Sequence, residues 1–226
     1  MHPTADTRIV IKLRGAARRV MPALCFFRGW SYFTVMEVNL ALENLRGGNA
    51  YDAFEAAKLL SRVPRLPAER IVNVLAEAEG AHNWEAAAYA LSWLRRKDRN
   101  KTLRALLNII GDESEHPAVR AQALEGLGVQ MPTVRHKLWA EVERAVLGGL
   151  SNEAVEVRFW ACYAAGSLRM KRALPHLSGM ARRDSAVCPR WWRVSEEAAD
   201  AVEWIHGRET EARLPPPDSP KGPDEA

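Results

Sequence analysis

Cysteine is scarce in this chain. Its 226 residues contain only three, Cys25, Cys162 and Cys188. Their odd number and wide spacing argue against a disulfide framework and fit a reducing compartment, so we expect the protein in the cytoplasm. Cys162 falls on an apolar stripe of the helical pattern described below. We therefore interpret it as a small buried hydrophobic residue and not as a nucleophile.

Motifs that hold metals, nucleotides or nucleophiles are also missing. The six histidines are scattered, and neither His-x-x-x-His nor Cys-x-x-Cys spacing occurs, which argues against a zinc site. No Gly-x-Gly-x-x-Gly, phosphate-loop or Gly-x-Ser-x-Gly pattern is present. We expect no metal, no cofactor and no catalytic residue, and hence a protein that acts by binding and is not an enzyme.

The chain has little that predicts strands or membrane spans. No long run alternates with period two, and no Asn-Gly or Asp-Gly turn separates apolar runs. Val20–Phe27 is apolar, but eight residues are too few to cross a bilayer, so we expect no membrane partner. The formal net charge of +4 permits an acidic partner without requiring one.

What the sequence does contain is an imperfect repeat with a period of roughly 31 to 38 residues. Val119-Arg120 and Val157-Arg158 open its two clearest copies. With each valine as position zero, positions four, eight and eleven lie on one stripe of an α-helix. An alanine repeated at position four predicts that two helices approach closely there, because a large side chain would overpack the contact. The residues at position four are Ala56, Ala87, Ala123, Ala161 and Ala198.

A second apolar-periodic segment follows each of the first four copies, often with a proline near its start. Gly80, Gly111 and Gly128 stand where helix C-caps are expected. The pattern predicts an all-α fold of antiparallel helix pairs, arranged as a right-handed α-solenoid of about five pairs. The predicted second helices are Ala68–Ala78, Arg99–Ile110, Thr133–Leu147 and Leu174–Arg183.

The combination of Val-Arg, Ala, Leu-Gly and a Leu-Pro before the second helix resembles the bacterial HEAT-like repeat, the repeat type of phycobilin lyase subunits. The resemblance covers about residues 50 to 206 and is strongest over 112–184, which contain Val119-Arg120, Val157-Arg158 and Leu174-Pro175. It implies a superhelical fold and says little about function, because HEAT-like proteins include scaffolds, chaperone-like lyases and a few DNA glycosylases.

Both ends differ in composition from the repeat domain, which we place at residues 36–207. Residues 1–35 are basic, and three interpretations compete: a targeting peptide, a basic arm, or a mis-assigned start with translation beginning at Met36. We favour the mis-assigned start, because Glu37–Leu45 opens a well-patterned helix. Residues 208–226 are rich in proline and acidic residues, which predicts a disordered tail.

Two groups of residues are candidates for binding. Trp191 and Trp192 interrupt an irregular segment where a polar loop is expected; they line a groove or, alternatively, cap the end of the core. Basic residues recur on the second helices, which in HEAT-like solenoids line the concave face; an ordinary solvated face is the alternative. The predicted basic binding residues are Arg99, Lys101, Arg104, Arg135, Lys137, Arg144, Lys171, Arg172, His176, Arg182 and Arg183.

Two classes of function remain open. The first is a non-catalytic scaffold or adaptor that offers the concave face of its solenoid to a protein partner with an acidic surface. The second is a nucleic-acid-binding protein similar to HEAT-like alkylpurine DNA glycosylases. No residue-by-residue match to a glycosylase site occurs, so no catalytic role is assigned. A steep salt dependence of DNA binding would distinguish the second class.

Overall fold

The computed structural model describes residues 34–64, 66–78, 80–94, 99–130 and 132–211. Within these ranges it has ten α-helices, one short 3-10 helix and no β-strand, which confirms the all-α prediction. The elements are α1 (Val35–Gly47), α2 (Ala50–Arg62), α3 (Ala68–Glu77), α4 (Ala81–Trp93), α5 (Arg99–Gly111), α6 (Pro117–Gln130), α7 (Trp139–Gly149), α8 (Val155–Ser167), η2 (Lys171–Ala173), α9 (Leu174–Arg183) and α10 (Val194–Ile205).

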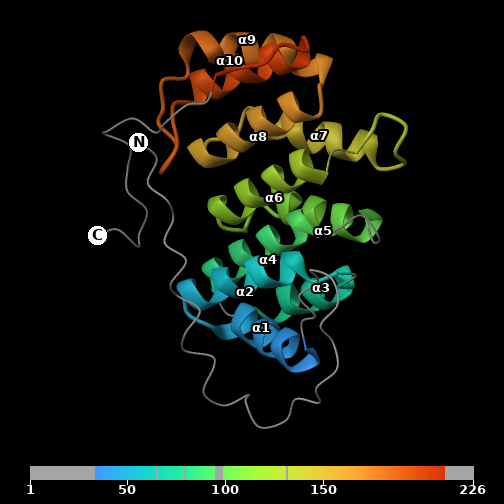
Figure 1. The fold of residues 1–226 in the computed structure, drawn as a ribbon. Helices are drawn as coiled ribbons and strands as arrows, with labels where there is room; N and C mark the ends of the chain where they lie inside the picture. Colours follow the sequence, from blue (N-terminus) through green and yellow to red (C-terminus); the bar gives the residue numbers. More distant parts are fainter. Residues whose placement is uncertain (1–33, 65, 79, 95–98, 131, 212–226) are drawn as a thin grey trace. The chain divides into compact units, whose positions relative to one another are not determined.

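The helices form two layers. The first-helix layer consists of α2, α4, α6, α8 and α10, each packed against the next, and the second-helix layer consists of α3, α5, α7 and α9. A second helix also packs against the first helix that follows it, and α1 packs on α2 and α3. Figure 1 shows this stack in chain order from α1 to α10. The arrangement is the α-solenoid of helix pairs that the repeat predicts.

Small residues hold the first-helix layer together. The position-four alanines of the five copies are buried, which confirms the predicted buried stripe. Four of them are fully buried and Ala56 is nearly so; the four are Ala87, Ala123, Ala161 and Ala198. Glycines act in the same way. A Cβ on Gly128, which lies inside α6, would stand 2.8 Å from Cε1 of Tyr163 on α8.

The C-cap prediction for two glycines is therefore wrong. Gly128 is used for close helix approach and lies two residues before the end of α6, and Gly80 is the N-cap residue of α4. The predicted helix Thr133–Leu147 also begins too early, because α7 starts at Trp139. Before it, the His136 N–H donates to the Thr133 carbonyl (2.8 Å), and the Leu138 N–H donates to Nδ1 of His136 (3.2 Å). A side chain that takes up a backbone N–H in this way favours a turn over a helix.

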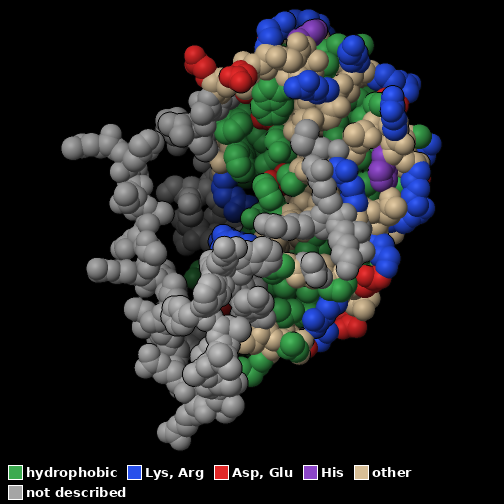
Figure 2. Space-filling view, turned by 45° about the vertical axis from the view of Figure 1, so that its right-hand side comes forward, with side chains coloured by type: hydrophobic (Ala, Val, Ile, Leu, Met, Phe, Trp, Pro, Cys, Tyr) green, Lys and Arg blue, Asp and Glu red, His purple; other side chains and the backbone are tan. Residues whose placement is uncertain are grey.

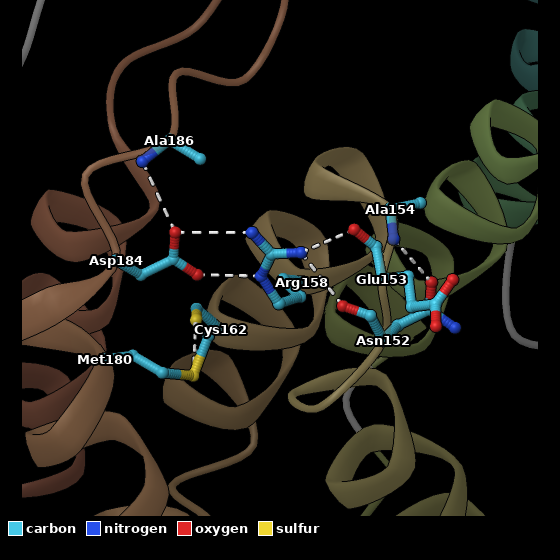
Figure 3. A network of polar contacts seen from close by, with 8 residues as sticks. All are labelled: Asn152, Glu153, Ala154, Arg158, Cys162, Met180, Asp184 and Ala186. Atoms are coloured by element: carbon cyan, nitrogen blue, oxygen red, sulfur yellow. Dashed lines mark hydrogen bonds and ion pairs between the residues drawn. The ribbon is translucent and has the colours of Figure 1, made fainter.

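The arginine of the Val-Arg motif has a structural role (Figure 3). Nε of Arg158 donates to Oδ2 of Asp184 at 2.7 Å, and Nη1 donates to the carbonyls of Asn152 (2.9 Å) and Glu153 (2.7 Å). The hydrogen bond to Asp184 raises the pKa of Arg158. In the preceding copy, Nε of Arg120 donates to the Ile110 carbonyl at 3.2 Å. Each arginine thus ties the start of a first helix to a neighbouring loop or helix end.

The first described helix is capped by a residue before Met36. Glu37 N–H donates to Oγ1 of Thr34 (3.1 Å), and Thr34 N–H donates to Oε2 of Glu37 (2.8 Å), which is a capping box. The hypotheses about residues 1–35 concern mainly residues 1–33, which lie outside the described residues. Residues 212–226 of the predicted tail lie outside them as well. The domain boundaries therefore stay predictions.

Candidate functional site

The predicted basic residues all lie on the second-helix layer or in the turns that lead into it. We call this set the basic surface. Its side chains are exposed apart from the half-buried Arg99. In Figure 2, Lys and Arg side chains gather along one side of the molecule. The members are Arg99, Lys101 and Arg104 of α5, Arg135 and Lys137 before α7, Arg144 of α7, Lys171 and Arg172 of η2, and His176, Arg182 and Arg183 of α9.

These residues differ in how their charge is compensated. Lys101 forms an ion pair with Glu69, and Arg172 pairs with Glu143 at 2.7 Å. Arg99 donates to the carbonyl of Gln130, which gives it a structural role at the end of α6. Several others form no ion pair within the described residues. These are Arg104, Arg135, Lys137, Arg144, Lys171, Arg182 and Arg183.

His136 lies among these cations and does not add to their charge. Partial burial, together with the positive charges of Arg99 and Lys137, lowers the pKa of His136 below its usual value. An imidazole with a lowered pKa is neutral at pH 7. His136 therefore adds no positive charge to the basic surface at this pH.

Helix spacing differs between the two layers. Neighbouring first helices approach closely through glycine and alanine, whereas neighbouring second helices make few mutual contacts. In a curved stack, the layer with the closer spacing lies on the inside of the curve. The spacing therefore favours the first helices, and not the second helices, as the concave side. We accordingly name the basic surface by its helices and not by curvature.

Trp191 and Trp192 lie in the loop between α9 and α10, and both are half-buried. The ring of Trp191 is 5.2 Å from that of Trp160, and the ring of Trp192 is 5.7 Å from that of Phe159. Nε1 of Trp192 donates to Oε2 of Glu197 at 2.9 Å. The pair thus packs on α8 of the first-helix layer.

The structure also brings together residues that sequence reasoning missed. Nη2 of Arg190, beside the two tryptophans, lies 3.9 Å from Oε1 of Glu85 on α4. Glu125 of α6 accepts a hydrogen bond from Gln122. Burial raises the pKa of Glu125, the hydrogen bond from Gln122 opposes this, and the negative charge of Glu85 adds to it.

We call this second group the acidic–aromatic surface. It consists of Glu85, Glu125, Trp160, Tyr163, Arg190 and Trp191. The repeat register contained a weak signal for it, because Glu85 and Glu125 stand at positions two and six of the register, which share the helix face opposite the apolar stripe. Nothing in the sequence indicates that Arg190, far along the chain, would lie beside Glu85.

The described thiols are poor candidates for chemistry. Cys162 is fully buried with Sγ 4.0 Å from Sδ of Met180, and burial raises its pKa well above the usual value. Burial likewise raises the pKa of Cys188 to about 12. The prediction that Cys162 is a small buried hydrophobic residue is confirmed. Within the described residues, no group of three or more His, Cys, Asp or Glu side chains could hold a metal ion.

A comparison with protein families bears on the repeat itself. Residues 103–201 match the family model for HEAT repeats. The matched stretch runs from α5 into α10 and supports a HEAT-like repeat family. The match is to HEAT repeats in general and does not show the repeat type of phycobilin lyase subunits. No curated protein matches the chain. Among the described helices, none is long and apolar enough to span a membrane.

Proposed function

We propose that this protein is a non-catalytic interaction scaffold whose basic surface binds a protein partner with an acidic surface. A HEAT-repeat solenoid fits such a scaffold, because its stacked layers offer an extended surface. The observation that carries the proposal is the recurrence, on α5, α7, η2 and α9, of exposed cations that form no ion pair with the residues the structure describes.

Arginine suits recognition of carboxylates. Its planar guanidinium can donate two parallel hydrogen bonds to one carboxylate, and it keeps its charge at all physiological pH values. Arg104 and Arg144 belong to successive second helices, so an acidic partner that follows the layer would meet one after the other. Charges of this kind mainly accelerate association and select the partner, and each contributes modestly to affinity.

Nucleic acid is the second candidate for the same surface, because phosphates also pair with Lys and Arg. Two acidic residues favour protein over nucleic acid. Glu141 is exposed on α7, and Glu143 of the same helix pairs with Arg172. Carboxylates among the cations weaken a continuous positive track for a phosphate backbone, whereas they can pair with basic side chains of a protein partner.

The test is a double charge reversal, Arg104→Glu with Arg144→Glu. We expect an unchanged thermal midpoint and about tenfold weaker capture of partners from native extract at low salt, with a smaller difference at high salt. The matched control is Lys58→Glu with Arg62→Glu on α2, which changes the net charge equally on the first-helix layer. Capture that survives the double change, or falls equally in the control, would contradict the proposal.

A parallel measurement separates the two candidates. The anisotropy of a labelled DNA duplex is followed at two salt concentrations with the same proteins. Binding that is lost steeply with salt and is abolished by the double reversal would assign the basic surface to nucleic acid.

A further inference from the structure

The segment between α6 and α7, residues 132–138, is fixed at both ends, and we call it the α6–α7 turn. Just before it, Nε2 of Gln130 at the end of α6 donates to the Ser92 carbonyl in the last turn of α4 (2.7 Å). Its first residue, Pro132, is buried, and its last residue, Leu138, is 2% exposed. Between these ends the turn projects from the stack next to α7 (Figure 1).

Hydrogen bonds set the conformation of the turn. The His136 N–H donates to the Thr133 carbonyl (2.8 Å), and the Trp139 N–H donates to the His136 carbonyl (2.9 Å). The Leu138 N–H donates to Nδ1 of His136 at 3.2 Å. A segment whose conformation is already fixed loses little conformational entropy when a partner binds it. The α6–α7 turn is therefore preorganised for an intermolecular contact.

The turn exposes an apolar side chain beside two cations. Val134 is 70% exposed, and it is the one large hydrophobic residue that is exposed in the turn or in α5, α7, η2 and α9. Arg135 and Lys137 follow it in the same turn, and both are exposed. Neither forms an ion pair with the residues that the structure describes.

The surroundings of Val134 favour an acidic protein as the partner. Arg99 of α5 donates to the Gln130 carbonyl, so a third cation lies at the start of the turn. This positive charge attracts carboxylates and disfavours a second copy of the same turn. Burial of an exposed valine requires an apolar depression in the partner, which a phosphate backbone does not offer. An apolar centre within a polar rim is also the usual anatomy of a protein–protein interface.

We propose that the α6–α7 turn is the anchor of the partner-binding surface: Val134 enters an apolar depression of the partner, and Arg135 and Lys137 pair with carboxylates around that depression. The inference rests on the proposed function and adds the place of the apolar contact and the kind of pocket that the partner has. The cations accelerate association and select an acidic partner, whereas burial of Val134 slows dissociation.

The test measures the affinity of the full chain for two fluorescein-labelled peptides by anisotropy at low salt. One peptide has two phenylalanines between two runs of three glutamates, and the other has two serines in their place. The phenylalanine peptide should bind several-fold more tightly, because its rings cover Val134. Val134→Ser should remove this preference and leave the affinity for the serine peptide unchanged. The matched control is Val35→Ser, at a valine of α1 that is 76% exposed, and it should keep the preference.

Charge variants separate this inference from the proposed function. Arg135→Glu with Lys137→Glu should bind both peptides about tenfold more weakly at low salt, because two attractive charges become repulsive. Unchanged affinities in this variant and in Arg104→Glu with Arg144→Glu would contradict the basic surface as a whole. If charge reversal weakens binding of both peptides while Val134→Ser keeps the preference for phenylalanine, the proposed function holds and the anchor is wrong.

Two further observations complete the test. Equal affinities of the unmodified protein for the two peptides would also overturn the anchor. Because the Val134 side chain is exposed, Val134→Ser should melt at the same temperature as the unmodified protein. If its melting temperature falls, Val134→Thr, which keeps the shape of the side chain, replaces it and should weaken the preference in the same direction.

Discussion

Residues without a side chain decide how closely the first helices pack. Gly166 of α8 is the tightest case among contacts with large rings. A Cβ there would stand 2.7 Å from Cε3 of Trp204 and 2.8 Å from Cα of Ala201, both on α10. Gly148 of α7, by contrast, has no atom within 4 Å of where its Cβ would lie. Two helical glycines of the same chain thus play opposite roles.

We predict that Gly166→Ala destabilises the protein by about 1 to 3 kcal/mol, because the added methyl group overpacks the α8–α10 contact. Gly148→Ala should instead be neutral or stabilise the protein by up to about 1 kcal/mol, because alanine has the higher helix propensity. Urea unfolding curves of both variants measure the two free energies. Equal stability of the two variants would contradict the close packing of α8 on α10.

At the scale of a single element, α1 shows how a helix end is fixed by a few polar groups. Thr34 and Glu37 satisfy each other's backbone N–H groups at its start, whereas Met36 between them is 66% exposed. The helix packs through Val38, Leu42 and Leu45. Its cap therefore comes from a residue before Met36, and its packing comes from residues after it.

We predict that Thr34→Ala lowers the free energy of unfolding by about 1 kcal/mol, the usual cost of removing an N-cap hydroxyl. The sequence-based hypothesis of a start at Met36 predicts equal melting temperatures with and without residues 1–35. The capping box predicts the opposite: a chain beginning at Met36 should show the same loss as Thr34→Ala, and one beginning at Thr34 should not. Thermal melts of the three proteins decide this, with Thr133→Ala, an exposed threonine outside any helix, as control.

Across the whole described array, a helix touches mainly its neighbours in the stack. First helices contact the preceding and following first helices and the adjacent second helices. Stability in such an array is approximately a sum of layer stabilities and nearest-neighbour contacts. A local defect should therefore weaken the layers next to it more than distant ones.

We predict that Ala161→Phe on α8 lowers the free energy of unfolding by about 1 to 3 kcal/mol or more, because a large side chain would overpack this contact. Ala161 is fully buried, and its Cβ leaves no room opposite, since a Cβ added to Gly149 would lie only 2.9 Å from it. Hydrogen exchange followed by mass spectrometry should show faster exchange in α6–α10 and little change in α2 and α3. Uniform acceleration along the chain would mean that the array unfolds as one unit. Unchanged exchange everywhere would refute the repeat register.

Local periodicity accounts for most of what could be predicted. The buried alanine stripe, the starts of α3, α5 and α9, and the alternation of first and second helices follow from apolar spacing and proline positions. The start of α7 could not be predicted, because His136 captures a backbone N–H within a segment of helical periodicity. Gly128 resembled a cap because a glycine inside a helix and a glycine after one look alike in a single sequence.

The sequence by itself determined the all-α fold, its pairing of helices and the placement of Lys and Arg on the second helices, because each depends on spacing within about one helix length. The tertiary structure alone decided which layer is closely spaced and that Arg190 meets Glu85 across α6. The physical reason is that these features depend on small rotations accumulated over several packed layers. Such rotations arise from contacts between distant residues and leave no trace in local periodicity.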